Sequence, residues 1–502
     1  MIDAHASEGA SRYWLIGALL GAWGAAIALA PDLTTRALLA TPLVLLPLAW
    51  WTLAGPARWT MLFLCAALLA PPLPVPWGDT GPHPSLLVAG LGVLAGLLRK
   101  DEWTASRGAR RGHSQEKLDE VVLAGGRQET LSGEQPSRLN FCLVLYLVAL
   151  LASLPFAAIY SGAALAAASL ARVLLFGVGV YLYFYTAQGP GSGVGVGEGF
   201  ANLRLLFWCG LASALFACVD FYWQLPAPAG FGPQYVWMES EIYRRAQGVF
   251  YEASTLGNLC VFFLVMIGVS LLRPRAQSPV SRPVLWIGAV VFFSALMLSF
   301  SRASLLSLGA AAAVLFWLHL WLHGGRFRWR WLIGIPAAAT LAVATTSWLF
   351  PRFADFYWLR LWASWHYFLS ATEGVLSGRL ASWRYLAAFL VERPWHALLG
   401  VGYKTLPYSD FVGRPVVADN AYLSALVETG LFGLAAMLAW NLALLGAGWR
   451  AARNADPRVS FFGAWILCFW SGQLAQMMSG DLLTYWRVLP LYFWVLAMAV
   501  RR

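Results

Sequence analysis

The chain has 502 residues, of which 59% are apolar and only 12% are charged. A water-soluble chain of this length carries about 25% charged residues and divides into several domains, so the composition excludes the soluble classes and indicates a polytopic membrane protein. The formal charge of +11 does not indicate a nucleic-acid partner. Most Lys and Arg residues lie in short loops between apolar runs, as the positive-inside rule predicts.

Apolar runs long enough to cross a bilayer, about 20 residues each, recur along the whole chain. We expect an all-α, polytopic integral membrane protein with 12–14 transmembrane helices and a large periplasmic loop that contains interfacial helices. Several runs are short or interrupted, so the expected number is a range. The expected spans are 13–30, 34–53, 58–75, 84–98, 138–159, 162–187, 203–220, 253–272, 283–300, 302–322, 331–350, 418–447, 460–478 and 483–500.

The basic loops fall on one side of the membrane if these spans alternate, and that side is predicted to be the cytoplasm, with both termini. The expected divisions of the chain follow from this orientation. They are an N-terminal transmembrane bundle at 1–220 with a cytoplasmic loop at 99–137, central helices at 221–350 with a periplasmic loop at 221–252, a large periplasmic loop at 351–417, and C-terminal helices at 418–502.

Two adjacent arginines, Arg244 and Arg245, stand just before a span on the outer side. Their guanidinium groups can bind phosphate oxygens in a bidentate manner, although arginines that only reach the lipid headgroups are also common at such a position. Arg302 stands at the outward start of another span, where the helix dipole disfavours a cation. An anion bound by Arg302 together with the free N–H groups would explain it; the alternative is an arginine paired with an acid or a lipid phosphate.

The large outer loop contains a predicted amphipathic helix from Ser377 to Arg393, with apolar residues at helical spacing and Pro394 as a stop. Arg379 lies near its start and is a candidate anion ligand. Arg384 projects about 140° away around the helix, and we expect it to face solvent or lipid.

A polar pair, Asp419-Asn420, precedes the next span. Asp419 either caps the helix or takes a proton from a hydroxyl group at the lip of the membrane, with Asn420 and Tyr422 orienting the reactants. Glu428 lies about 13 Å deeper at 1.5 Å per residue. Ionisable residues at such depth are functional or paired with an arginine.

Three further residues are secondary candidates. Gly400 and Gly402 predict a tight turn, with close approach to a substrate as the alternative; the segment is too short for a dinucleotide motif. His366 falls on the outer side without metal-ligand spacing, and we interpret it as a structural histidine or a spare base. We expect no metal site and no cofactor.

Five segments together resemble the O-antigen ligase and O-antigen (Wzy-type) polymerase superfamily of membrane glycosyltransferases. They are RAQGVFYEASTLGN at 245–258, SRASLLSLG at 301–309, GRLASWRYL at 378–386, LLGVGY at 398–403 and DNAYLSALVETGLFG at 419–433. The resemblance implies transfer of a glycan from an undecaprenyl-diphosphate carrier to a lipid- or glycan-linked acceptor sugar, with no metal ion. It implies a bacterial inner (cytoplasmic) membrane protein of cell-envelope or lipopolysaccharide biosynthesis, surrounded by membrane lipids, with the site facing the periplasm.

By motif position, the resemblance gives the donor diphosphate to Arg245, Arg302 and Arg379. Ligases that attach glycan to lipid A-core usually show His-Asn where this chain has Asp419-Asn420. Asp-Asn variants look similar to exopolysaccharide polymerases, so the choice between ligase and polymerase stays open. We therefore expect an inverting, metal-independent glycosyltransferase. The alternatives are an anion transporter, for example for bicarbonate, and a non-catalytic scaffold.

Overall fold

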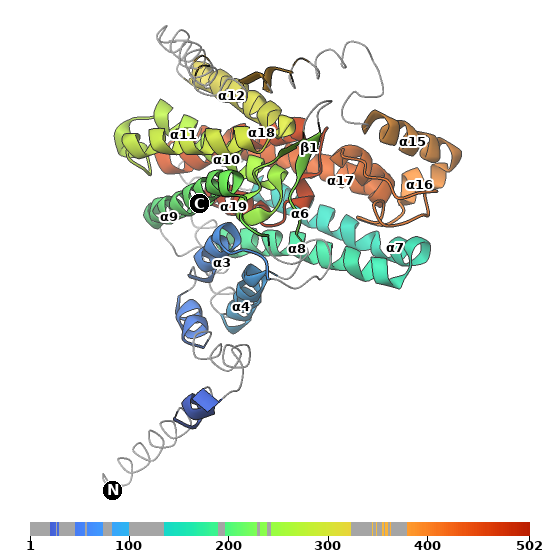
Figure 1. The fold of residues 1–502 in the computed structure, drawn as a ribbon, viewed down its shortest axis with the longest axis horizontal. Helices are drawn as coiled ribbons and strands as arrows, with labels where there is room; N and C mark the ends of the chain where they lie inside the picture. The colour runs from blue at the N-terminus through green and yellow to red at the C-terminus, as the bar shows by residue number, and fades with distance from the viewer. Residues whose placement is uncertain are drawn as a thin grey trace, which may run out of the picture.

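The computed structural model shows a helical bundle, which confirms the all-α prediction (Figure 1). It describes residues 21–26, 28–29, 46–55, 58–73, 83–99, 135–188, 196–227, 231–237, 242–322, 344, 348, 354–355, 357–359, 362 and 379–501. Most of the expected span at 331–350, most of the loop at 99–137 and most of the loop segment 351–378, with His366, lie outside these residues.

The described helices overlap the predicted spans, but several limits differ: helices end at Leu69 and begin at Val196 and Leu489, where 75, 203 and 483 were predicted. The longer ones are α3 (Arg58–Leu69), α4 (Pro84–Leu98), α6 (Gln135–Ala152), α7 (Leu154–Ser161), α8 (Ala163–Gln188), α9 (Val196–Trp223), α10 (Ala253–Leu272), α11 (Arg282–Leu298), α12 (Arg302–Leu322), α15 (Arg379–Glu392), α16 (Pro394–Leu399), α17 (Ala421–Ala452), α18 (Pro457–Gln476) and α19 (Leu489–Val500). Three short 3-10 turns are η2 (Gly248–Phe250), η3 (Arg275–Gln277) and η5 (Leu482–Thr484), and the two strands β1 (Tyr235–Trp237) and β2 (Ile242–Arg244) form an antiparallel hairpin.

Three helices form the centre of the bundle. Helices α10, α18 and α19 are apolar around most of their circumference and are buried along most of their length. A helix with this pattern has no face for water and belongs inside a bundle. Helix α18 packs against α12, α17 and α19, while α19 also packs against α8. The core therefore joins the C-terminal helices α18 and α19 to helices from earlier in the chain, such as α8 and α10.

The outer helices expose large apolar side chains, as a membrane protein requires. Phe141 on α6, Trp286 on α11 and Leu442 on α17 are each more than half exposed. A soluble monomer rarely shows so much apolar surface. Among the described residues, six helices are long and apolar enough to cross a membrane, and four more are apolar but shorter. This supports a multi-pass membrane protein, whereas the expected number of 12–14 spans stays a prediction.

The arginine-rich turns and the segments before α10, α12 and α17 lie at opposite ends of the bundle. Arg273 ends α10 and donates a hydrogen bond from Nη1 to the carbonyl of Pro457, at 2.7 Å, so two of these turns meet. Helix α11 runs back from this end, and a tight turn at Phe300, with φ of 51°, leads into α12. The C-terminus also lies away from the end that carries α15 and α16 (Figure 1).

A break in α17 is repaired by a neighbouring loop. Gly430 has φ of 71° and ψ of −175°, which interrupts the helix. The carbonyls of Val427 and Glu428 accept hydrogen bonds from the N–H groups of Val401, at 3.0 Å, and Gly402, at 2.9 Å. Unpaired backbone groups are costly in a membrane, so a broken helix needs such partners. These bonds fix the loop after α16 against α17.

The predicted outer helix is present as α15, although its surroundings differ from the expectation. Pro394 follows α15 and begins α16 instead of ending helical structure. Leu386 and Phe389 of α15 are buried against a second, smaller core that includes Val401 and Val416. One face of α15 is thus covered by the protein itself, which fixes the position of Arg379 at its first turn.

We predict that Gly430→Ala destabilises the fold. The left-handed φ strains any side chain, and an added Cβ would lie 2.2 Å from the carbonyl oxygen of Leu398. Strain and overpacking each cost about 1–3 kcal/mol. The matched control is Gly309→Ala in α12, where a Cβ meets nothing within 4 Å, and which should leave stability unchanged or slightly higher. Thermal unfolding in detergent measures both; equal melting temperatures would contradict the prediction.

Candidate active site

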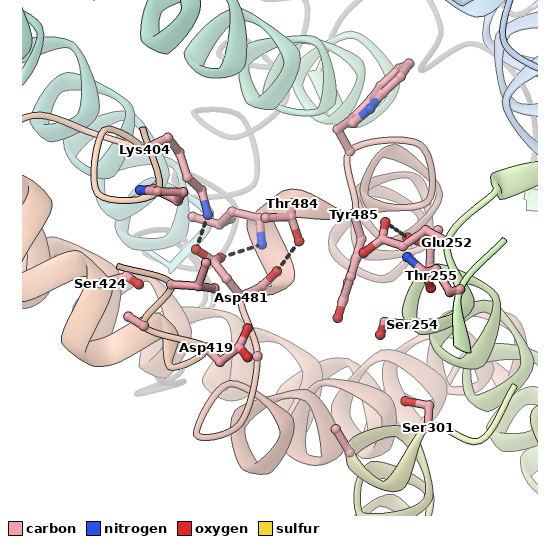
Figure 2. Close-up of a pocket in the computed structure, with 18 of the residues that line it drawn as sticks. Glu252, Ser254, Thr255, Ser301, Lys404, Asp419, Ser424, Asp481, Thr484 and Tyr485 are labelled. Carbon is pink, nitrogen blue, oxygen red and sulfur yellow. Dashed lines mark hydrogen bonds and ion pairs between the residues drawn. The ribbon is translucent and has the colours of Figure 1, made fainter. Parts of the chain in front are cut away.

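A cavity of about 920 Å³ opens at the end of the bundle where α10, α12 and α17 begin. Among the described residues, six cationic side chains and four carboxyl groups line it. The cations are Arg172, Arg245, Arg302, Arg379, Lys404 and Arg487, and the carboxyl groups are Glu252, Asp419, Glu428 and Asp481. In Figure 2, Lys404, Asp481 and Asp419 lie on one wall, and Glu252 with Tyr485 lies on the other. So many charges around one cavity indicate a site for a polar or ionic ligand.

Arg245 is held by the protein backbone at the cavity wall. Its N–H donates to the carbonyl of Gln234, and its Nε donates to the carbonyl of Ser299, both at 2.8 Å. Burial lowers the pKa of this arginine, and the nearby charge of Arg302 adds to the effect. Two guanidinium groups so close together repel each other, so an anion between them would be favoured.

Arg302 begins α12, as the sequence predicted, directly after the turn at Phe300. Ser254 of α10, Ala303 of α12 and Ser424 of α17 also line the cavity, so the first turns of three helices face it. Helix N-termini carry partial positive charge and unpaired N–H groups. The backbone therefore adds to the positive potential of the arginines.

Arg379 and Asp419 form an ion pair, with 2.9 Å between Nε and Oδ2. The two side chains are 28% and 42% exposed, respectively, so the pair remains accessible from the cavity. Asp419 has φ of 45°, a left-handed conformation that aspartate tolerates better than most residues. Asp419 does not cap α17, because Asn420 does so. The carboxylate of Asp419 is thus not used as a helix cap; it pairs with Arg379 and lines the cavity.

Three predicted residues make structural contacts and do not line the cavity. Arg244 turns away and pairs with Asp220, with 3.3 Å between Nη2 and Oδ1. Asn420 accepts hydrogen bonds from two N–H groups of the first turn of α17, each at 3.0 Å. The hydroxyl of Tyr422 donates to the carbonyl of Leu474 at 3.1 Å. The structure brings none of the three to the diphosphate candidates, so their catalytic or binding roles stay predictions.

The two glycines contact the protein backbone. Gly400 and Gly402 have φ of 79° and 115°, which fits the predicted tight turn. A Cβ on Gly400 would lie 2.5 Å from the carbonyl oxygen of Glu428, and one on Gly402 would lie 2.5 Å from Cα of Ala157. Glycine is therefore required at these two positions because the backbone of Gly400 packs against α17 and that of Gly402 packs against α7.

Two cavity residues that the sequence did not indicate, Lys404 and Asp481, form an ion pair on the cavity wall that is largely buried, 11% and 13% exposed. Oδ1 of Asp481 also accepts from the N–H of Leu483 at 3.0 Å. Glu428, 3% exposed, accepts from the N–H groups of Lys404 and Leu406. One signal was available: Lys404 is one of only three lysines in the chain and directly follows the glycine turn.

Glu252 was also missed, although it ends the RAQGVFYE segment. It lies at the N-cap of α10, and Oε2 accepts from Oγ1 of Thr255 at 2.6 Å. Burial raises the pKa of Glu252, and this effect outweighs the hydrogen bond from Thr255 and the nearby Arg245, which both lower it. The cavity thus holds a carboxyl group whose proton is retained to higher pH than usual. Within the described residues, no three His, Cys, Asp or Glu side chains are grouped to hold a metal ion.

One part of the chain matches a known protein family. Residues 287–438 match the family model described as O-antigen ligase. The matched region runs from α11 to α17 and includes Arg302, Arg379 and Asp419. It begins after Arg245, which is not part of it. A search of curated proteins found no match to the chain.

We predict that Lys404→Met destabilises the protein by about 3 kcal/mol, because it leaves the carboxylate of Asp481 buried without its cation. The double variant Lys404→Met/Asp481→Asn removes both charges and should recover most of this loss. Denaturant unfolding in detergent measures the free energy of unfolding of the single and double variants. Equal destabilisation of the single and double variants would show that the pairing of the charges contributes nothing.

We also predict a pH dependence of stability from Glu252. Because its pKa is raised above the ordinary value of about 4.3, the folded state binds this proton more tightly than the unfolded state. The resulting stability is full below the ordinary pKa and is lost as pH rises through the folded-state value. Glu252→Gln imitates the protonated form. Its melting temperature relative to wild type should therefore rise between about pH 4 and about pH 8, and a constant difference would contradict this assignment.

Proposed function

We propose that this membrane protein transfers a glycan from an undecaprenyl-diphosphate carrier to an acceptor sugar, because residues 287–438 match the family model described as O-antigen ligase. One observation carries the proposal. Arg245, Arg302, Arg379 and Asp419 come from four separate segments and line one cavity of about 920 Å³. Three guanidinium groups match the charge of a diphosphate, and a carboxylate beside them supplies a base.

The proposed reaction is a single displacement. The oxygen of the acceptor hydroxyl forms a bond to the anomeric carbon of the donor glycan, while the bond from that carbon to the diphosphate oxygen breaks. The proton of the hydroxyl passes to Asp419, and the bonding electron pair leaves with the diphosphate. Attack opposite the leaving group inverts the anomeric configuration. Groups placed where charge develops supply the largest share of such catalysis.

The arginines offset the charge that grows on the leaving diphosphate. Arg245 is fixed by the carbonyl of Ser299, so its position needs no reorganisation when charge develops. Arg379 lies between the proposed base and the proposed diphosphate site, because it pairs with Asp419 and lines the same cavity as Arg302. With this cationic set, we propose that the transfer requires no metal ion.

We propose that the cavity faces the periplasm and that the protein lies in the inner membrane. The arginine-rich turns after α10 and α17 support this orientation, because they lie at the other end of the bundle and basic loops stay in the cytoplasm. Transport of an anion is less well supported. In the described core, Phe262, Trp465 and Tyr492 are buried and in ring contact, so this part of the bundle is apolar and unsuited to an anion.

The central test is transfer by the purified full chain in lipid. It uses an undecaprenyl-diphosphate oligosaccharide, a panel of acceptors and a chelator. We expect wild type to release the lipid diphosphate and form a joined glycan. Arg302→Ala and Asp419→Ala should each lower kcat by about 10²–10³, the typical cost of removing one group that stabilises developing charge.

The matched control is Arg384→Ala, an exposed arginine one turn beyond Arg379 on α15, which should retain wild-type transfer. Full activity in the Arg302 variant would remove Arg302 from the proposed diphosphate site. Retained transfer in the Asp419 variant alone would move the base to another group, with Glu252 next because it lines the same cavity. Absence of transfer by wild type with every donor and acceptor would contradict the proposal itself.

A further inference from the structure

A second, smaller cavity of about 350 Å³ adjoins the large one. Its wall is formed by Arg379, Ser382, Arg414, Pro415, Val416, Val417 and Asp419. Four of these residues, Arg379, Val416, Val417 and Asp419, also line the large cavity. The ion pair of Arg379 and Asp419 therefore stands between two spaces and is reached from both.

The smaller cavity is built from positioned elements. Arg379 and Ser382 are three residues apart on α15 and so share one face of the helix. The opposite wall is the segment from Arg414 to Asp419, which Trp383 of α15 ties down by donating from Nε1 to the carbonyl of Ala418 at 2.6 Å. Both walls are thus joined to the same helix, and the distance between them is fixed.

Arg414 is exposed, yet its guanidinium group is held in place. It lies 4.7 Å from the ring centre of Tyr385, in a cation–π contact. The hydroxyl of Tyr385 in turn donates to the carbonyl of Val412 at 2.6 Å. A stacked guanidinium keeps its edge N–H groups available for a carboxylate or phosphate. Among the described residues, no carboxylate forms an ion pair with Arg414, so it presents an ordered cation.

Charge and size define the ligand class. The lining contains two arginines and one carboxylate, so its net charge is positive. Its volume is at the low end of ligand pockets, about 300–1,000 Å³, which suits one sugar unit and not a lipid carrier with its diphosphate. Ser382 supplies a hydroxyl group for hydrogen bonds to sugar hydroxyls.

We propose that this second cavity is the acceptor subsite and that it selects an acidic sugar, whose carboxylate binds Arg414. This inference rests on the proposed function. The acceptor hydroxyl would approach Asp419 from this side while the donor diphosphate occupies the large cavity, so the proton passes to the carboxylate across the shared wall. The donor and acceptor then meet at the one carboxylate that both cavities share.

Binding is tested first, without turnover. The probes are glucuronate and glucose, added to the full chain in lipid and followed by saturation-transfer NMR. We expect a signal for glucuronate that exceeds the one for glucose, is lost in Arg414→Gln and is retained in Arg302→Gln. Loss in Arg302→Gln with retention in Arg414→Gln would place the anion in the large cavity and overturn the proposal, as would equal signals for both sugars in wild type.

Kinetics then separate acceptor from donor. With an acceptor that ends in a uronate, Arg414→Gln should raise the acceptor KM about tenfold or more, the usual effect of one charge-assisted hydrogen bond. It should leave the donor KM unchanged, and it should leave unchanged the KM of a matched acceptor that ends in a neutral hexose. Arg384→Gln, at an exposed arginine of the neighbouring helix α15, is the control and should alter neither constant.

The outcomes distinguish this inference from the proposed function. A raised donor KM in Arg414→Gln would assign the arginine to the carrier diphosphate and overturn the acceptor subsite, while transfer itself would stand. Unchanged constants for every substrate would also overturn it. Selective binding of glucuronate through Arg414 in a protein that transfers no glycan would support the subsite and contradict the transfer.

Discussion

The hydrogen bonds across the break in α17 hold the site together. Gly430 interrupts the helix, and the carbonyls of Val427 and Glu428 find their donors in the loop that contains Gly402. Water cannot replace these donors in the hydrocarbon region, so the loop and the broken helix must fold as one unit. This constraint places Lys404 and the carboxyl group of Glu428 at the cavity wall.

Electrostatic balance is the second constraint on the cavity. Isolated charges are expensive away from bulk water, and their cost falls when opposite charges pair. Lys404 pairs with Asp481, and Arg379 pairs with Asp419. Arg245 instead binds a backbone carbonyl, and the first turns of three helices add partial positive charge. The ion pairs thereby reduce the cost of these charges in the ligand-free protein. The remaining positive potential of the cavity still favours an anion over a neutral ligand.

Position in the fold separates residues that serve the site from those that support it. Arg244 and Arg245 are neighbours in an extended strand end, where successive side chains point to opposite sides. One binds Asp220 on α9, and the other lines the cavity. A similar division holds at the start of α17, where Asn420 caps the helix and Asp419 meets Arg379. In each pair of neighbouring polar residues, one side chain thus stabilises the fold and the other lines the cavity.

The membrane class, the approximate positions of most helices and the candidate arginines could be predicted from the sequence, because apolar length and the position of charges depend on local chain properties. The start of α12 at Arg302 and the extent of α10 from Ala253 to Leu272 follow from such signals. Which polar residues meet could not be predicted in this way, because it depends on the packing of distant segments. The pair of Lys404 and Asp481 joins residues 77 positions apart, and the second cavity needs α15 beside residues 414–419. No periodicity encodes such contacts, because they arise from how distant helices pack.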